Sequence, residues 1–313
     1  MADARVVCIG LATLDVIVAV DRLPGRDERV PASAGMLAGG GVAATAAVAL
    51  ARLGVPVAFV GRVGRDDAGA RVRDGLAAEG VDVTGLHVDE GETPFSVILV
   101  DRGTGARSIV PWAGSGGWTE VSDDAAALCQ RAAWIHVDHV GVAAVRGLRE
   151  RGVATRISLD AGNPIADAPL DVVDLYAPTE TSLLARSPGM SLEGAMAAAL
   201  DEGATTVVAT RGAAGSIAAT RDADGTVHIA EAPAFDVDVV STLGAGDVFH
   251  GALLAALVDG AAIDDALRFA NGAAALSCRA LDGRSAIPRR DELEAFLAAA
   301  PRDAAMKELR HAG

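Results

Sequence analysis

The segment VVSTLGAGDVFHGALLAAL, residues 239–257, places three small residues and one acid between a β-branched run and a long apolar run. Its pattern predicts a strand that ends near Val240 and a helix from about Asp247, with Gly244-Ala245-Gly246 between them. Glycines let a backbone approach a ligand, and the first turn of a helix offers unpaired N–H groups and the positive end of its dipole. We therefore expect this turn to stabilise negative charge.

Asp247 stands beside that anion site, where a carboxylate would repel a phosphate unless it has another task. It is suited to take the proton from an attacking hydroxyl while the neighbouring amides stabilise a phosphoryl group. An anion site and a base in one turn indicate phosphoryl transfer. The pattern also fits a plain helix start, in which the acid only interacts with the helix dipole.

Composition limits the class of protein. A chain of 313 residues with 51% hydrophobic residues is globular, and it is long enough for one large α/β unit or two domains. Its net charge of -15 disfavours binding to nucleic acid or to anionic membranes. The chain has a single lysine, Lys307, which excludes a P-loop ending in GK[ST].

The cysteines and the N-terminus indicate neither a metal site nor export. Cys8, Cys129 and Cys278 are far apart and lack the spacing of a zinc site, so we expect small buried side chains. No apolar run reaches the ~20 residues that a membrane span needs. The start MADARVVCIG does not resemble a signal peptide, and we expect the protein to be cytoplasmic.

Strand-like and helix-like segments alternate along the chain. Apolar residues recur at helical spacing between Val42 and Leu53, and short β-rich runs occupy 5–10, 57–61, 134–138, 157–160 and 205–210. This rhythm predicts an α/β fold with a mostly parallel, Rossmann-like sheet flanked by helices. We expect one domain over residues 1–300 and a frayed tail over 301–313.

Two regions break this rhythm. Residues 13–37 and 93–112 alternate apolar and polar positions, and Arg102-Gly103-Thr104-Gly105 is typical of a turn. They predict a small antiparallel sheet inserted into the domain. Because ligands of open α/β sheets bind at the carboxyl ends of the strands, we expect this sheet to form a lid there.

The chain resembles the ribokinase-like (PfkB) carbohydrate kinases from Gly10 to about Leu297. STLGAGDVFHGALL is similar to the C-terminal signature of that family, GGGVAATAAVALARLG with VGRVGRDDAG to its N-terminal signature, and TRGAAG to its nucleotide loop. The resemblance implies a kinase that uses ATP and Mg²⁺, with Asp247 as the base and Gly244, Ala245 and Gly246 as the anion hole.

The same resemblance assigns the sugar side of the site. Asp15 matches the acid that binds sugar hydroxyls from the base of the lid, which suits a carboxylate because its oxygens accept several hydrogen bonds. Gly39, Gly40 and Gly41 would form the turn beneath the sugar. A polar strand position and a flexible helix lead-in are the respective alternatives.

On the nucleotide side, Thr210, Gly212 and Gly215 would line the phosphates and ribose, and Asn271 would lie beside the adenine. Glu180 matches the acid that holds Mg²⁺ through water. The asparagine of that NxxE motif is replaced by Ala177, so half of the motif is missing. A helix-start acid is the alternative for Glu180.

Two departures from the family bear on specificity. Ribokinases have GGKGAN where this chain has GGGVAA, so the Lys and Asn that contact ribose are absent, and Gly41 predicts a larger pocket for a sugar with an extra substituent. Ser241 stands where the family has an Asp that helps bind a monovalent cation. Activation by K⁺ is therefore left open, with carbonyl oxygens at 278–283 as the remaining ligands.

Among subfamilies, the motifs and DGRSAIP at 282–288 are most similar to the sulfofructose kinases. A sulfonate requires cationic or N–H partners, for which Arg29, Arg107 and His139 are candidates. Solvated lid-edge charges are the alternative for the two arginines. We expect a ketose or other modified sugar as the acceptor, with sulfofructose as the named alternative.

Other functions remain open in different degrees. A nucleoside kinase is disfavoured by the few aromatic residues, and a nicotinamide oxidoreductase by the absence of GxGxxG after the first strand. A sugar sensor that does not catalyse is the other alternative. We also expect a homodimer formed through the lid, with Val16, Val18 and Val20 on the paired face.

Overall fold

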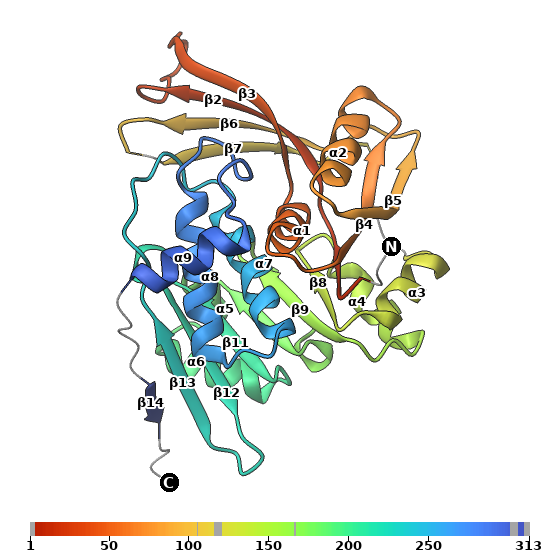
Figure 1. Cartoon of the computed structure of the whole chain (residues 1–313), viewed down its shortest axis with the longest axis vertical. Helices are drawn as coiled ribbons and strands as arrows, with labels where there is room; N and C mark the ends of the chain where they lie inside the picture. The colour runs from red at the N-terminus through yellow and green to blue at the C-terminus, as the bar shows by residue number, and fades with distance from the viewer. Residues whose placement is uncertain (1–3, 105, 116–120, 166, 301–305, 310–313) are drawn as a thin grey trace.

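The computed structural model describes residues 4–104, 106–115, 121–165, 167–300 and 306–309. Within these residues the strands form a ten-stranded sheet of order β14-β13-β12-β11-β10-β9-β8-β1-β4-β5 and a four-stranded sheet of order β3-β2-β6-β7 (Figure 1). The strands of the large sheet are β1 (Val6–Ile9), β4 (Val57–Gly64), β5 (Asp82–Asp89), β8 (Trp134–Val137), β9 (Arg156–Ala161), β10 (Leu175–Pro178), β11 (Thr206–Thr210), β12 (Ser216–Arg221), β13 (Val227–Ala232) and β14 (Met306–Leu309).

Strand β1 shows why the middle of the large sheet is parallel and buried. It pairs in parallel with β4 and with β8, and its four residues are fully buried. Val6 and Cys8 belong to one apolar cluster, and Val7 and Ile9 belong to the other. Both faces of the strand are therefore covered, which explains its continuous apolar sequence.

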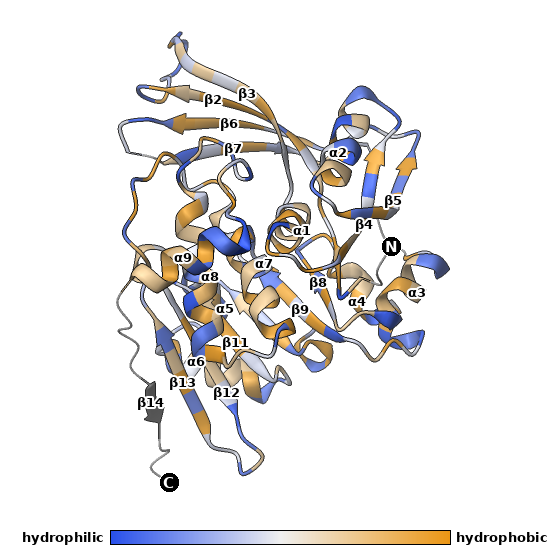
Figure 2. Cartoon of the chain, in the orientation of Figure 1, coloured by the Kyte–Doolittle hydropathy of each residue, from blue (hydrophilic) through white to orange (hydrophobic). Residues whose placement is uncertain are grey.

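The helices form two layers on the sheet. The described helices are α1 (Val42–Arg52), α2 (Asp67–Ala78), α3 (Asp123–Arg131), α4 (Ala143–Glu150), α5 (Glu180–Arg186), α6 (Leu192–Asp201), α7 (Ala245–Val258), α8 (Ile263–Ser277) and α9 (Arg290–Ala299). Apolar residues of α1, α2, α7, α8 and α9 pack in the first cluster, and those of α3 to α6 pack in the second. Figure 2 shows the hydrophobic residues concentrated in the strands between these layers. The predicted Rossmann-like α/β architecture is confirmed.

The chain after β13 differs from the prediction. No strand forms at Val240, because the amides of Val240 and Ser241 donate to the carbonyl oxygen of Cys278 at the end of α8 instead of to a sheet. Val239 is also 51% exposed, so this β-branched run has no buried face. In the segment predicted to be frayed, Met306–Leu309 pair with β13 as β14, and the rest of it lies outside the described residues.

The lid exists as a separate sheet of β2 (Thr13–Val20), β3 (Ala32–Gly40), β6 (Phe95–Asp101) and β7 (Arg107–Trp112). Its two antiparallel hairpins, β2–β3 and β6–β7, are joined by parallel pairing of β2 with β6. Ile17, Ile98 and Val100 pack on Leu243, directly before α7. The inner face of the lid thus contacts the turn predicted to bind anions. Gly105 of the predicted lid turn lies outside the described residues.

The outer face of the lid is apolar, but it does not include every residue that the sequence predicts for it. Val16 is 36% exposed, whereas Val20 is only 3% exposed, because a register shift between Ala19 and Val20 interrupts the alternation.

Among the described helices, none is long and apolar enough to cross a membrane. The cytoplasmic location stays a prediction.

Candidate active site

The turn before α7 has the geometry of an anion site. Gly244 adopts a left-handed conformation with φ of 73°, and a Cβ there would lie 2.8 Å from Cα of Gly283, so glycine is required. The helix begins at Ala245 without a side-chain cap. In the described part of the chain, no group accepts a hydrogen bond from the amides of Gly246 and Asp247. These two amides are free to bind a phosphoryl group, whereas the amide of Ala245, which was predicted to belong to the anion hole, donates to the carbonyl oxygen of Thr242 at 3.4 Å.

Asp247 lies half-buried in this first turn of α7. Burial raises its pKa well above the usual value, the charges of Asp160 and Asp138 raise it further, and Arg284 and Arg107 oppose the shift. No described side chain donates a hydrogen bond to its carboxylate. A free carboxylate with a raised pKa is a stronger proton acceptor than an exposed one, as a general base requires.

Asp15 extends from β2 on the inner face of the lid. It is buried and accepts a hydrogen bond of 2.7 Å from Oγ1 of Thr13. Burial raises its pKa, while Thr13, Arg284 and Ser96 lower it. Gly40 lies beside it on β3, and a Cβ at Gly40 would overlap Oδ2 of Asp15. Gly39 and Gly40 are therefore the last residues of strand β3 and not part of a turn as predicted, and Gly40 makes room for the predicted sugar acid.

Gly41 has a different role from the one predicted. Its φ is 92°, and an added Cβ would overlap the carbonyl oxygen of Leu11 and lie near Cα of Ala12. The missing side chain therefore faces backbone rather than the sugar site. The expectation that Gly41 enlarges the pocket is not supported, because the space is already filled.

Arg284 is the residue that sequence reasoning missed. It comes from the loop between α8 and α9, is 8% exposed, and donates from Nη2 to the carbonyl oxygen of Gly40 at 2.6 Å. A Cβ at Gly39 would overlap its Nη1, so the first of the three glycines makes room for this guanidinium. The motif DGRSAIP was visible in the sequence, but nothing local in it indicates contact with residues 39–45.

The three predicted sulfonate-binding candidates are placed differently from one another. Arg107 reaches from β7 and donates to Oγ1 of Thr242 at 2.8 Å, next to the anion site. His139 follows β8, and its Nδ1 is 3.3 Å from Nδ2 of Asn163, which follows β9. Arg29 lies exposed in the connection between β2 and β3, beyond the end of β2 that is remote from Asp15. Arg29 is therefore not brought to the site.

The predicted nucleotide residues lie at the ends of β10 to β13. Thr179 bridges to Thr210 and caps α5, so Glu180, the first residue of that helix, lies beside Thr210. Gly212 opens a short 3-10 turn, Gly212–Ala214, with φ of 55°. This arrangement brings the predicted metal-binding acid next to the predicted phosphate loop.

Gly215 and Asn271 meet at the chain that leaves β13. A Cβ at Gly215, whose φ is 88°, would overlap the carbonyl oxygen of Ala232. Nδ2 of Asn271 donates to the carbonyl oxygens of Ala232 and Pro233 at 2.9 and 3.1 Å. Asn271 therefore holds this segment in place and leaves its side-chain oxygen for any other partner.

The donor groups of the site fit the two metal ions that the family resemblance implies to different degrees. Within the described residues, no cluster of three or more His, Cys, Asp or Glu side chains is arranged to hold a metal ion. A lone acid such as Glu180 fits Mg²⁺, which binds mainly through substrate phosphates and water. The fit to K⁺ is poor, because Oγ of Ser241 accepts from the Leu243 amide and the Cys278 carbonyl already accepts two amides.

A buried polar cluster lies beneath Asp247. Nε2 of His250, one turn further along α7, is 3.3 Å from Oδ2 of Asp160 on β9, and burial raises the pKa of Asp160 to about 6. Burial lowers the pKa of His250 and of His136 to about 4, so both rings are neutral near pH 7. The negative charge that raises the pKa of Asp247 therefore comes from Asp160 and Asp138.

Asp138, directly after β8, ties the site to its scaffold. Its Oδ2 accepts from the amides of Leu11 and Ala43 at 2.8 and 3.1 Å, and its Oδ1 from Val140 and Gly141, both at 2.9 Å. The carboxylate thus fixes the first residues of α1 against the end of β1. From the sequence, Asp138 is predicted only as the last residue of the β-rich run 134–138.

We expect Asp138→Asn to destabilise the protein, because an amide group can accept on one side only. Two of the four backbone amides would lose their acceptor, at a cost of about 3–5 kcal/mol in the free energy of unfolding. Denaturant-induced unfolding measures this change. Asp171→Asn is the control, since Asp171 forms an exposed ion pair with Arg146 and should matter little. Equal losses in the two variants would contradict this role of Asp138.

Comparison with known proteins decides the family. A model of the pfkB family carbohydrate kinases matches residues 3–290. The chain belongs to this family. This pfkB kinase is 31% identical over 307 residues to the ATP-dependent ribose-1-phosphate kinase of Halopiger xanaduensis, covering 94% of this chain and 98% of that protein. It is 30% identical over 306 residues to a ribokinase of Arabidopsis thaliana, covering 91% and 78%.

The fold of the pfkB kinase agrees with solved structures. The structure of Arabidopsis thaliana ribokinase complexed with ribose and ATP superposes with a TM-score of 0.81 at 27% identity, over 96% of this chain and 100% of that chain. A Thermotoga maritima ribokinase superposes with a TM-score of 0.82 at 25% identity, over 94% and 99%. The predicted family, fold and class of enzyme, an ATP-dependent carbohydrate kinase, are confirmed.

Proposed function

We propose that this kinase transfers the γ-phosphoryl group of ATP to a hydroxyl of a ketose or modified sugar. The observation that carries the proposal is the first turn of α7, where two unpaired amides adjoin the free carboxylate of Asp247. The lid supplies Asp15 on its inner face, and Arg284 acts electrostatically on both acids. An acceptor bound by Asp15 would thus lie between the lid and the anion site.

The residues divide the reaction between them. The carboxylate of Asp247 accepts the proton of the sugar hydroxyl. At the same time the oxygen of that hydroxyl forms a bond to the γ-phosphorus, and the bond between the γ-phosphorus and the leaving ADP oxygen breaks. The amides of Gly246 and Asp247, at the N-terminus of α7, stabilise the charge on the transferred group. Mg²⁺ would be held near Glu180, where it neutralises charge on the ATP phosphates. Thr210, Gly212 and Gly215 would bind the nucleotide.

Several observations bear on the sugar. The relatives named above act on ribose or ribose-1-phosphate, whereas this chain has glycine and alanine in place of the ribose-contacting Lys and Asn. Arg107 adds positive charge beside Asp247, and His139 lowers the pKa of Asp160, the buried acid that acts on Asp247. A sugar with an anionic substituent, such as sulfofructose, is therefore the second candidate acceptor.

A coupled ADP-release assay with Mg-ATP tests the proposed function. The acceptors are fructose, ribose, ribose-1-phosphate and sulfofructose, each also titrated calorimetrically against the protein. We expect sugar-dependent ADP release with at least one ketose. A sugar that binds without turnover would indicate a sensor, and turnover with nucleosides alone would indicate a nucleoside kinase.

We also infer that the lid pairs two copies of the chain. Its outer face carries a row of exposed apolar side chains on β3, β2, β6 and β7, and Figure 2 shows β2 and β6 as mostly hydrophobic. The exposed members of this face are Val16, Leu37, Phe95, Val97, Val110 and Trp112. Such an apolar surface is typical of an interface between subunits.

We expect Val110→Asp to weaken this dimer, because Val110, on the edge strand β7 and paired with Val97 of β6, is 67% exposed on that face. An unpaired carboxylate in an interface costs about 3 kcal/mol or more, which raises the dissociation constant by roughly 100-fold. Analytical ultracentrifugation measures the change. Met190→Asp, at an exposed apolar residue outside the lid, is the control. A monomeric wild type would refute the dimer, and an unchanged Val110→Asp dimer would refute its placement on the lid.

A further inference from the structure

Two of the three nitrogens of the Arg284 guanidinium donate hydrogen bonds to described residues, and the third does not. Its Nε donates to Oγ1 of Thr45 at 3.2 Å and its Nη2 donates to the carbonyl oxygen of Gly40 at 2.6 Å. For Nη1, no acceptor exists among the residues that the structure describes. This nitrogen lies over Gly39, the residue whose missing side chain gives it space. Arg284 thus presents a donor beside the glycine turn predicted to lie beneath the sugar.

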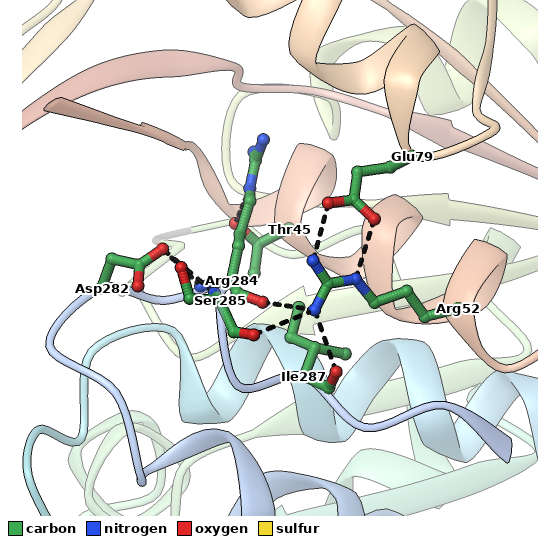
Figure 3. Close-up of polar contacts among 7 residues, drawn as sticks. All are labelled: Thr45, Arg52, Glu79, Asp282, Arg284, Ser285 and Ile287. Atoms are coloured by element: carbon green, nitrogen blue, oxygen red, sulfur yellow. Dashed lines mark hydrogen bonds and ion pairs between the residues drawn. The ribbon is translucent and has the colours of Figure 1, made fainter. Parts of the chain in front are cut away.

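The loop that carries Arg284 is held firmly. Figure 3 shows Arg52 of α1 between Glu79 and this loop: its Nη1 donates to the carbonyl oxygens of Arg284 and Ile287 at 2.8 and 2.9 Å. Glu79 accepts from Nε and Nη2 of Arg52 at 2.8 and 2.6 Å. The guanidinium of Arg284 is therefore presented in a fixed place, which lowers the entropic cost of binding a ligand.

Oδ2 of Asp282 adds a second restraint to the same loop. It accepts from the amides of Arg284 and Ser285 at 3.2 and 3.1 Å (Figure 3). With Arg52 on the carbonyl side and Asp282 on the amide side, the backbone on both sides of Arg284 is hydrogen-bonded.

The surroundings of Arg284 explain why a buried cation is tolerated there. Burial lowers its pKa to about 10, and the charges of Asp15, Asp247, Glu79 and Asp282 oppose that change. It therefore stays protonated near neutral pH. The two carboxylates with the largest effect on it are the predicted sugar acid and the predicted base, so Arg284 is the cation that both acids share.

We propose that Arg284 is a substrate-binding residue, whose Nη1 donates a hydrogen bond to an oxygen of the acceptor sugar that Asp15 also binds. Asp15 then accepts from a sugar hydroxyl while Arg284 donates to a neighbouring sugar oxygen, so the pair recognises a polyhydroxylated acceptor. The inference rests on the proposed sugar kinase function. It also explains two of the three successive glycines, since Gly39 makes room for Arg284 and Gly40 for Asp15.

The test compares Arg284→Gln and Arg284→Lys with the wild type. Calorimetric titration with the sugar that binds the wild type best, from the panel above, gives the sugar Kd, and the coupled assay gives the two KM values. We expect Arg284→Gln to raise the sugar Kd and KM by about 10- to 100-fold, the range for a hydrogen bond from a charged donor, with the KM for ATP unchanged. Arg284→Lys should lie between, because it keeps the charge without the planar fork.

Arg149→Gln is the matched control, because Arg149 on α4 also donates to backbone carbonyl oxygens, those of Val153, Thr155 and Val172, away from the site. It should lower the melting temperature without changing the sugar Kd. If Arg284→Gln fails to fold, the Lys variant and Gly39→Ala, which displaces Nη1, carry the same test.

The outcomes separate the two proposals. Arg284 variants that bind sugar like the wild type and only lose stability, as Arg149→Gln does, would overturn the inference. A wild type that binds sugar without transferring phosphate would overturn the kinase function, but the sugar Kd of the Arg284 variants would still test the inference. A wild type that binds no sugar of the panel would overturn both.

Discussion

Replacing Asp247 by Asn is expected to lower kcat by ~10²- to 10⁴-fold with little change in sugar Kd, the usual loss when a general base is removed. The amide has nearly the same shape but cannot accept the proton of the sugar hydroxyl. No described side chain donates to this carboxylate, so its structural role is small and the protein should stay folded. The coupled assay and calorimetric titration measure the two quantities.

Asp259→Asn is the matched control for this prediction. Asp259 caps the other end of α7 and pairs with Arg5 and Arg290, so its loss should leave kcat unchanged. Near-normal turnover of Asp247→Asn would refute the assignment of the base. A loss of similar size in Asp259→Asn would show that α7 as a whole, rather than the carboxylate of Asp247, is responsible.

The pH dependence of the wild type follows from the same carboxylate. A base acts when it is ionised, and burial together with Asp160 and Asp138 raises the pKa of Asp247. Activity should therefore fall as the pH drops through this raised value, at a higher pH than for an ordinary aspartate. Asp160→Asn removes one negative neighbour and should move this acid limb of kcat/KM to lower pH. A limb that does not move would exclude Asp247 as the titrating group.

Buried, regular elements could be predicted from sequence, and exposed or short ones could not. The run at 57–61 is continuous and apolar because helices cover both faces of its strand. Strand β5 was missed because it lies at the edge of the sheet and keeps polar, half-exposed positions. At Val239 and Val240 the opposite error occurred, since a β-branched run has high strand propensity but here has no sheet to join.

The residues of the candidate site also differ in how far they can be predicted: some are indicated by their spacing within one turn, and others are brought together only by tertiary packing. Asp247 and Gly244 belong to one turn, so their spacing alone predicts an anion site next to an acid. Arg284 is 244 positions from Gly40, and only tertiary packing brings its guanidinium to that carbonyl oxygen. A signal existed in the three successive glycines, because adjacent positions that all exclude a Cβ indicate that other side chains occupy the space.

Gly246→Val is expected to abolish phosphoryl transfer while the protein stays folded. Gly246 is exposed, has ordinary helical conformation, and an added Cβ would meet no atom within 4 Å, so a side chain fits without strain. The branched side chain would however stand over the unpaired amides at the start of α7 and keep a phosphoryl group at a distance. Because stabilisation by such amides is worth about 10²- to 10³-fold for one donor, we expect kcat to fall by at least roughly 100-fold.

Two comparisons isolate the effect of covering these amides. Gly75→Val places the same side chain on an exposed glycine of α2 with equally open surroundings, so it should fold and keep full activity. Gly244→Ala should instead lower the melting temperature, because Gly244 has φ of 73° and its Cβ would press on Gly283. Retained transfer in a folded Gly246→Val protein would mean that the phosphoryl group binds elsewhere. Loss of folding in that variant would mean that the first turn of α7 is packed more tightly than its open surroundings indicate.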